Sequence, residues 1–156
     1  MQSRAHELWA RFFGSSMKDD LRYTPTDCFE TFPFPEGWLS SSTIDAEGSA
    51  YSEFRTALMS ARNEGLTDTY NRFHDPAETS ADIQQLRTLH AAMDRAVLGA
   101  YGWTDLAPVA EFIPEFDADD IEPGTRARRK YRLRWPDEAR DEVLARLLEL
   151  NRQRAR

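Results

Sequence analysis

Cysteine and lysine are both scarce in this chain, which has one cysteine, Cys28, and two lysines among its 20 basic residues. A single cysteine excludes an internal disulfide bond and a zinc site of the cysteine-rich kind. No cation neighbours Cys28 in the sequence to lower the pKa of its thiol, which favours a buried, inert side chain over a nucleophile. No apolar run approaches the roughly 18 residues of a membrane span, and the N-terminal residues lack the pattern of a signal peptide. We therefore expect a cytoplasmic protein with no membrane partner.

Glycine is also scarce, and the arrangement of the seven glycines excludes several enzyme classes. No Gly-x-Gly is present, so the dinucleotide fingerprint and the glycine-rich loop of a methyltransferase cofactor site are absent, as is the P-loop. Neither lysine completes the acidic-x-Lys pair of many metal-dependent nucleases. Ala10 stands where a zinc-protease helix starting at His6 would place its second histidine. We expect a chain that is not an enzyme by itself and has no catalytic residues, cofactor or metal ion of its own.

Apolar residues are abundant enough for one globular domain, at 40% of 156 residues with nine Phe and four Trp. From Ser49 to Tyr101 they recur at helical spacing in two segments, which are joined by the polar connector 63–76. Gly65 suits a left-handed residue after the first helix, Ser80 suits the N-cap of the second, and Gly102 ends it. This pattern predicts a helical hairpin around which the rest of the chain is arranged.

Two elements are expected before the hairpin. Ser3 could cap a helix that ends near Gly14 and has an apolar face of Ala5, Leu8, Trp9 and Phe12. The prolines at 25, 33 and 35 favour extended chain, with a short strand on either side of Pro25. Residues 39–48 are small and polar, which is typical of a linker.

After the hairpin we expect an acidic loop at 104–124, a strand within 126–135 and a last helix that begins at Pro136 and Asp137. The apolar stripe of that helix consists of Val143, Leu144, Leu147 and Leu148 and continues to Asn151. The predicted fold class is therefore mainly α: a helical hairpin plus a C-terminal helix, with a few short β-strands.

The net charge of −7 hides an asymmetry along the chain. From Arg126 to Arg156 there are 11 basic and 5 acidic residues, whereas residues 1–125 contain 9 basic and 22 acidic residues. Tyr131 and Trp135 interleave with the basic residues of the predicted strand, which makes this segment the best candidate for phosphate binding. An equally weighted interpretation is a solvated strand face that pairs with the acidic loop. The basic candidates are Arg126, Arg128, Arg129, Lys130 and Arg132, with Arg134 in the same segment.

Two groups that contain histidine also have two interpretations each. A divalent metal could find ligands in four residues close in sequence, His74, Asp75, Glu78 and Asp82. A capped turn explains them more simply, because few metal sites contain only one histidine. His90 and Asp94 lie one helical turn apart and could form either an acid/base pair or an ordinary hydrogen bond. A metal-dependent enzyme built on His74 or His90 is the least favoured function.

Three stretches carry a resemblance to a known family: residues 21–35, LRYTPTDCFETFPFP; residues 64–76, EGLTDTYNRFHDP; and residues 89–103, LHAAMDRAVLGAYGW. Together they resemble the C-terminal end of the large MmeI-like type IIL/IIG restriction-modification DNA methyltransferases. That group includes the methylase of DISARM-type phage-defence systems. The similarity runs through nearly the whole chain, including the segment RWPDE at 134–138 and the final helix.

The resemblance implies a division of labour. A preceding domain would bind S-adenosylmethionine and methylate adenine N6, and a target-recognition domain would read the DNA. Residues 1–38 would form the end of a target-recognition-like segment, and residues 49–156 a C-terminal helical domain that supports it. By analogy, Arg22, Tyr23 and Thr24 lie nearest to the DNA. The catalytic Asn-Pro-Pro-Tyr motif and the glycine-rich cofactor motif of the family have no counterpart here, so this chain cannot methylate alone.

We therefore expect a non-catalytic C-terminal module of a DNA adenine-N6 methyltransferase, from a restriction-modification or phage-defence system, that supports target recognition. Its partners would be double-stranded DNA and the methyltransferase catalytic domain or subunit. The alternative is a stand-alone helical adaptor or oligomerisation protein that binds a protein partner through its N-terminal helix. The two differ in DNA dependence and in whether the surface of Leu8, Trp9, Phe12 and Phe13 is covered within the chain.

Overall fold

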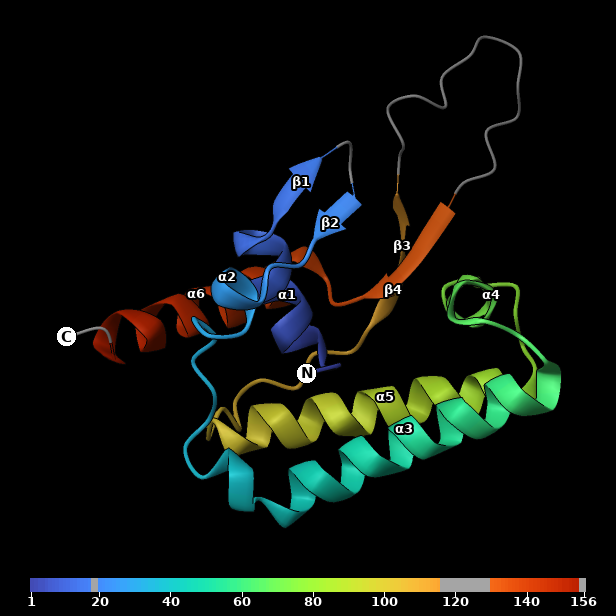
Figure 1. The fold of residues 1–156 in the computed structure, drawn as a ribbon, viewed down its shortest axis with the longest axis horizontal. Helices are drawn as coiled ribbons and strands as arrows, with labels where there is room; N and C mark the ends of the chain where they lie inside the picture. Colours follow the sequence, from blue (N-terminus) through green and yellow to red (C-terminus); the bar gives the residue numbers. More distant parts are fainter. Residues whose placement is uncertain (18–19, 116–129, 155–156) are drawn as a thin grey trace, which may run out of the picture.

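The computed structural model describes residues 1–17, 20–115 and 130–154, and their fold is mainly helical (Figure 1). The elements in chain order are α1 (Arg4–Phe13), β1 (Ser15–Met17), β2 (Asp20–Arg22), α2 (Pro25–Cys28), the 3-10 helix η1 (Trp38–Ser40), α3 (Ser42–Arg62), α4 (Leu66–Phe73), α5 (Ala81–Ala100), β3 (Glu111–Glu115), β4 (Lys130–Arg134) and α6 (Asp137–Arg154). This order confirms the predicted fold class of a helical hairpin plus a C-terminal helix with short β-strands.

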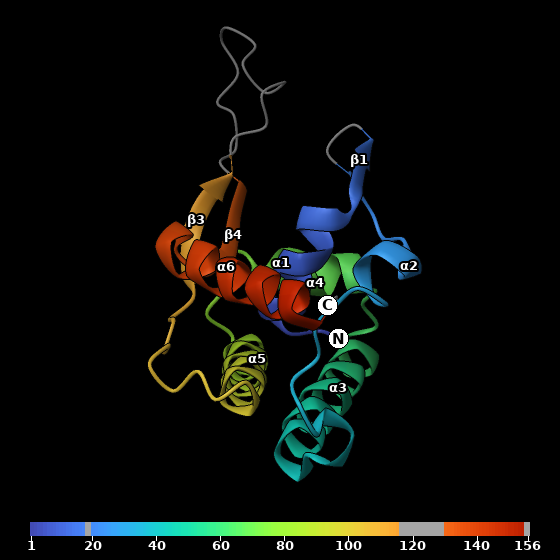
Figure 2. The ribbon, with the colours of Figure 1, turned by 90° about the vertical axis from the view of Figure 1, so that its left-hand side faces the viewer.

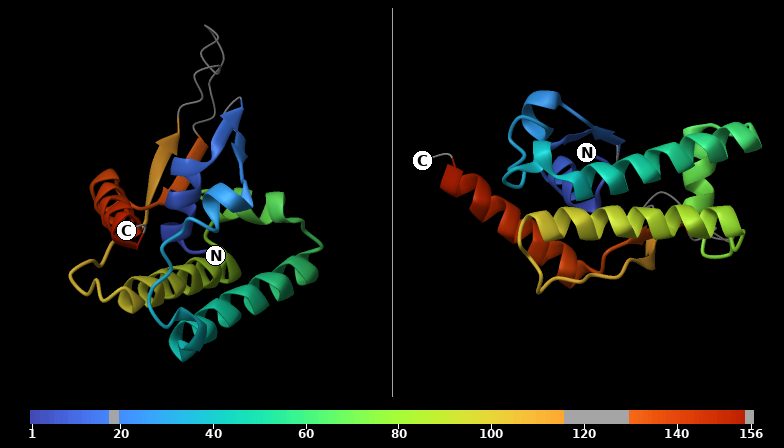
Figure 3. Two further views of the ribbon diagram at one scale, coloured as in Figure 1. Left: turned by 60° about the vertical axis from the view of Figure 1, so that its left-hand side comes forward. Right: turned by 90° about the horizontal axis from the view of Figure 1, so that it is seen from below.

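Helices α3 and α5 run antiparallel and side by side, and they form one layer of the molecule (Figures 1 and 3). Helices α1 and α6 lie in a second layer above them, and both two-stranded β-hairpins project from this layer away from α3 and α5 (Figures 1 and 2). The two layers place the N-terminal strands and the C-terminal strands on one side of the molecule, although almost 90 residues separate the end of β2 from the start of β3.

The predicted linker at 39–48 is wrong for most of its length, because α3 begins at Ser42. Ser41 caps the helix, and its side-chain oxygen accepts a hydrogen bond from the Ile44 amide at 3.3 Å. Gly48 lies within the helix, where a glycine costs about 1 kcal/mol relative to alanine. A run of serines that looks like a linker therefore supplies a helix cap.

The polar connector predicted at 63–76 contains a further helix, α4, which crosses the ends of α3 and α5 (Figure 3). Its buried residues, Thr69 and Phe73, are one helical turn apart, so the helix has one face in the core. The left-handed residue after α3 is Asn63, with φ 51° and ψ 43°, and not Gly65 as expected. Gly65 instead precedes α4 as its N-cap, with φ −83°.

The helix boundaries predicted elsewhere are confirmed. Ser3 accepts a hydrogen bond from the His6 amide at the start of α1, and Gly14 follows its last residue. Ser80 is the N-cap position of α5, although its side chain makes no capping bond there, and Gly102 lies directly beyond the C-cap with φ 74°. One position of the predicted α1 face is wrong, because Phe12 is exposed.

The strands agree with the sequence in part. β4 pairs antiparallel with β3, with Ile113 opposite Arg132, so the described part of the expected acidic loop at 104–124 contains a strand. Residues 116–124 of that predicted loop lie outside the described residues. β1 pairs with β2, which ends three residues before Pro25. The strand predicted directly after Pro25 is wrong, because this proline starts the short helix α2, where its missing N–H is not needed.

The core has two clusters, and both join distant parts of the chain. One contains Trp9 of α1 and Phe32 together with Leu98, Trp135 and Leu147. Residues 1–38 and residues 49–156 thus share this cluster. The second lies between the hairpin, α4 and β4 and consists of Tyr51, Phe73, Leu86, Met93 and Leu133. Burial of these aromatic and aliphatic side chains fixes β4 against α1 and α4.

Candidate phosphate-binding site

The residues expected to contact DNA fall into two groups that the fold brings to the same side of the molecule. Arg22 ends β2, and Tyr23 and Thr24 connect β2 to α2, on one β-hairpin. Lys130 and Arg132 lie on β4 of the other (Figures 1 and 2). The remaining candidates, Arg126, Arg128 and Arg129, lie outside the described residues.

Tyr23 is held in place by α1. Its side chain is 41% exposed, and its hydroxyl forms a 3.1 Å hydrogen bond with Nε2 of His6. Burial lowers the pKa of His6 to about 4, with a smaller contribution from the positive N-terminal amine, so the imidazole is neutral at pH 7. Tyr23 is therefore an exposed residue anchored to α1, and it follows exposed Arg22 in the chain.

Arg132 is neutralised mainly by a residue that the sequence did not suggest. Its Nη2 donates to Oε1 of Glu7 on α1 at 2.8 Å, whereas its distance to Glu115 on β3 is 3.9 Å. For Arg132, the pairing with the acidic segment that one interpretation expected is thus this longer contact. Arg134, two residues along β4, donates to Asp137 at the start of α6 at 2.6 Å.

A cavity of about 240 Å³ opens between α1, the β3–β4 hairpin and the start of α6. Most of its lining is charged, and we call the charged lining residues the cavity cluster: Arg4, Glu7, Arg11, Glu115, Arg132, Arg134 and Arg140. Leu8 and Trp135 complete the wall. Guanidinium groups bind phosphate oxygens with paired N–H donors, so five arginines around one cavity form a candidate phosphate-binding site.

Sequence reasoning identified Arg132 and missed the α1 side of this cavity. Arg4, Glu7, Leu8 and Arg11 follow the i, i+3, i+4, i+7 spacing of one helical face. That spacing was available in the sequence as a signal for a charged face on the first helix. Arg140, one turn into α6, carries no comparable signal.

Arg4, which lines the cavity, belongs to a buried ion pair. Arg4 Nη1 donates to Oδ2 of Asp94 at 2.5 Å and to Nδ1 of His90 at 2.8 Å, and its backbone N–H donates to Oδ1 of Asp94. A guanidinium can only donate, so Nδ1 of His90 accepts and cannot also donate to Asp94, which lies 3.3 Å away. His90 and Asp94 are thus joined through Arg4, and the acid/base interpretation of the pair has no support in this geometry.

The residues considered for a metal site are bound to other groups. Nδ1 of His74 accepts the Leu133 amide of β4 at 3.1 Å, and burial, followed by the charge of Arg132, lowers the pKa of His74 to about 4. Asp75 accepts a hydrogen bond from the Ala77 amide. Within residues 1–17, 20–115 and 130–154, no group of three His, Cys, Asp or Glu side chains is arranged to hold a metal ion. Cys28 is buried, and its thiol donates to the Ala10 carbonyl.

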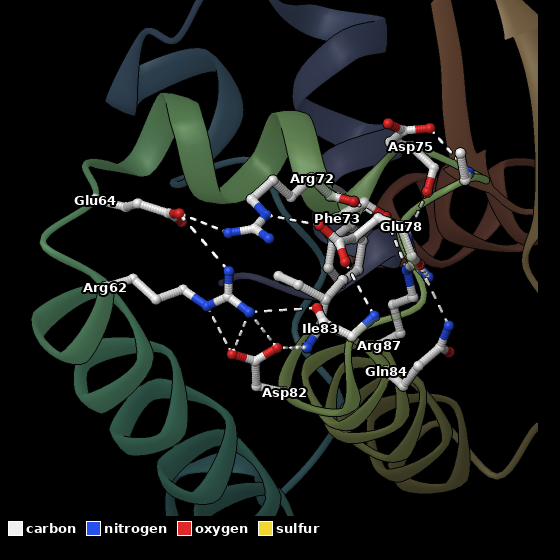
Figure 4. Close-up of polar contacts among 12 residues, drawn as sticks. Arg62, Glu64, Arg72, Phe73, Asp75, Glu78, Asp82, Ile83, Gln84 and Arg87 are labelled. Carbon is white, nitrogen blue, oxygen red and sulfur yellow. Dashed lines mark hydrogen bonds and ion pairs between the residues drawn. The ribbon is translucent and has the colours of Figure 1, made fainter.

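The polar connector and the start of α5 contain a second group of paired arginines and carboxylates (Figure 4). We call it the connector cluster: Arg62, Glu64, Arg72, Glu78, Asp82 and Arg87. Arg62 binds both oxygens of Asp82, each at 2.6 Å. Arg72 binds Glu64 at 2.6 Å and Glu78 at 2.7 Å. Arg87 donates to four backbone carbonyls, those of Arg72, Phe73, Asp75 and Glu78. These bonds fix the ends of α3, α4 and α5 relative to one another.

No helix in the described part of the chain is long and apolar enough to cross a membrane. Comparison with known proteins adds no identification: no protein-family model matches the chain, and no curated protein or solved structure shows significant similarity to it.

Proposed function

We propose that this chain is a cytoplasmic, non-catalytic C-terminal module of a DNA adenine-N6 methyltransferase, from a restriction-modification or phage-defence system, and that it supports target recognition by binding the phosphate backbone of duplex DNA. The observation that carries the DNA-binding part is the cavity cluster, in which five arginines from α1, β4 and α6 surround one cavity. Contacts of this kind set the register and orientation of a protein on DNA, while other residues read the bases.

Two further features support the proposal. The two β-hairpins project on the same side of the molecule (Figure 2). Arg22 ends β2 at the base of one hairpin, and Lys130 begins β4 of the other, whose residues Glu115, Arg132 and Arg134 line the cavity. The resemblance to MmeI-like methyltransferases implies that the parent enzyme is a DNA methyltransferase whose cofactor is S-adenosylmethionine. Methyl transfer would be carried out by the catalytic domain or subunit of that enzyme.

Binding of the purified chain to duplex DNA across a salt series tests the proposal. The variant Arg132→Gln/Arg134→Gln removes two arginines of the cavity cluster. Its matched control, Arg95→Gln/Arg152→Gln, removes two exposed arginines that do not line the cavity. We expect salt-sensitive binding, and in the cavity variant alone a loss of about tenfold in affinity with a salt slope reduced by about two.

Absence of binding at about 50 mM salt would contradict the proposal, because phosphate contacts are strongest at low ionic strength. Equal losses in the two variants would also contradict it, since they would show an effect of net charge and not of the cavity. Both variants should unfold within about 1 kcal/mol of the parent chain, because partly exposed ion pairs contribute little to stability.

A second candidate function, a helical protein-interaction or oligomerisation adaptor, is favoured by one observation. Trp9 and Leu8 pack in the core, whereas Phe12 is 54% and Phe13 38% exposed at the end of α1. Exposed neighbouring aromatic side chains are typical of protein contacts. The mass in solution of the parent chain and of Phe12→Gln/Phe13→Gln tests this candidate. An oligomer that the variant converts to a monomer would support it, and a monomer in both would count against self-association through this surface.

A further inference from the structure

Glu7 has an unusual position within the cavity cluster. One of its oxygens, Oε1, accepts from Arg11 Nε at 2.9 Å and from Arg132 Nη2 at 2.8 Å. These two donors come from different elements, α1 and β4, and converge on a single oxygen. A phosphate oxygen between two guanidiniums has the same arrangement of donors. Glu7 thus stands where an anion bound by Arg11 and Arg132 would place an oxygen.

The other arginines of the cavity cluster also have carboxylate partners. Arg4 is bound to buried Asp94, and Arg134 and Arg140 share Asp137, at 2.6 and 3.0 Å. The site is therefore close to electrically balanced in the free protein. An incoming phosphate gains full access to these guanidiniums only by displacing a carboxylate that already occupies them.

Glu7 is the carboxylate best placed to be displaced. Its side chain is 39% exposed, so it can rotate into solvent, whereas Asp94 is buried and anchors the start of α1. Burial alone would raise the pKa of Glu7, but Arg132 and Arg11 outweigh it and hold the pKa below its ordinary value, so the group is an anion at neutral pH. Glu7 is consequently a full charge that competes with any anion for the same two donors.

We propose that the cavity between α1, β4 and α6 is a binding site for a single phosphate group, with Arg11 and Arg132 as its ligands, and that Glu7 is a resident counter-anion that occupies this site until phosphate displaces it. The inference rests on the proposed function for the source of the phosphate, the DNA backbone, although the site would take a free phosphate by the same chemistry. Glu7 then weakens binding to every phosphate and limits it to ligands that engage several arginines at once.

The test compares Glu7→Gln with a control that matches it closely. Glu142 on α6 also accepts from an arginine one turn later, Arg146 Nε, at 2.7 Å, but lies away from the cavity. Glu142→Gln therefore removes the same charge and the same kind of helical ion pair. Affinities for a short DNA duplex and for inorganic phosphate are measured by calorimetry at about 50 mM salt. We expect Glu7→Gln to bind the duplex about tenfold more tightly than the parent chain, and Glu142→Gln to remain within about twofold.

Two additional variants make the result specific. Glu7→Gln/Arg132→Gln should lose the gain, because one of the two ligands is gone. Glu7→Ala, which suits a helix, should reproduce the gain if the glutamine variant proves poorly folded. Equal affinities of Glu7→Gln and Glu142→Gln for both ligands would overturn the inference, as would a gain that survives the loss of Arg132.

The two ligands separate this inference from the proposed function. Phosphate binding that Glu7→Gln strengthens, without DNA binding in any variant, would uphold the site and refute the DNA-binding function. DNA binding by the parent chain that Glu7→Gln leaves unchanged would uphold the DNA-binding function and refute the phosphate site. No binding of either ligand by any variant would refute both.

Discussion

The connector cluster and the cavity cluster are both built from arginines and carboxylates, yet they differ in what their guanidiniums face. In the connector cluster all members come from residues 62–87, and Arg87 donates to four backbone carbonyls (Figure 4). In the cavity cluster the arginines come from both ends of the chain, and they surround an open space. The density of arginine therefore does not mark a binding site. The cavity cluster differs in that its guanidiniums line a space that a ligand can enter, and that one of their counter-ions, Glu7, is exposed enough to leave it.

Arg4 lines the cavity, but its guanidinium is held by hydrogen bonds within the protein, as in the connector cluster. A substitution of its partner Asp94 should therefore have the largest effect on stability. Asp94→Asn leaves the buried guanidinium without a counter-charge, so we expect a loss of about 3–5 kcal/mol in the free energy of unfolding. Chemical denaturation measures it. Asp141→Asn, which alters an exposed ion pair with Arg140, is the control and should leave stability nearly unchanged. Equal stabilities of the two variants would contradict a structural role for the Arg4–Asp94 pair.

The connector cluster should affect stability and not binding. Arg87→Met keeps an apolar side chain at this position but removes a charged donor from four carbonyls. The carbonyls of Arg72, Asp75 and Glu78 keep hydrogen bonds from other donors, whereas that of Phe73 loses its bond to Arg87, so we expect a loss of about 1–3 kcal/mol. The folded variant should bind duplex DNA as the parent chain does. Denaturation and a DNA titration on the same sample measure both quantities. Weaker DNA binding by the folded variant would place the connector cluster in the interface and remove the distinction between the two clusters.

His74 connects the region of the connector cluster to the strand that carries the cavity arginines. It is the C-cap of α4, and its Nδ1 accepts a hydrogen bond from the Leu133 amide of β4. Its pKa, like that of His6, is lowered to about 4, mainly by burial. The unfolded chain takes up protons near pH 6.5 and the folded chain near pH 4, so the unfolded state binds more protons between these values. Stability from the neutral histidines is therefore complete above about pH 6.5 and falls as the pH falls, by up to about 3 kcal/mol for each residue near pH 4.

Unfolding curves between those pH values test this prediction. His6→Gln/His74→Gln removes both titrating groups, and its stability should depend on pH less steeply than that of the parent chain. A slope that the double variant retains in full would assign the pH dependence to other groups.

Local patterns predicted most of the fold and little of the candidate site. Ser3, Gly102 and the Pro136–Asp137 pair marked helix boundaries correctly, because caps and breakers act on the residues next to them. Helix α4 was missed because most of its residues are polar, as in a loop. The only signal for it in the sequence is the helical spacing of Leu66, Tyr70 and Phe73. Strand β3 was missed because its acidic residues and Pro114 look like a loop.

The site depends on contacts that no local pattern contains. Glu7 and Arg132 are 125 residues apart, and Arg4 and Asp94 are 90 residues apart. The sequence predicted the basic strand correctly and left two interpretations of it open, phosphate binding and pairing with the acidic loop. It did not suggest the ion pair between Arg132 and Glu7 of the first helix. Only the packing of α1 between β4 and α5, through Trp9 and Ala5, brings these charges together.

The most direct test follows the arginine side chains themselves. Titration of the isotope-labelled chain with a short DNA duplex, monitored through the Nε–H signals of its arginines by NMR, compares both clusters in one sample. We predict that the signals of Arg11, Arg132, Arg134 and Arg140 shift as DNA is added, while those of Arg62, Arg72 and Arg87 stay in place. Shifts confined to the connector cluster, or no shifts in either cluster at low salt, would contradict the account.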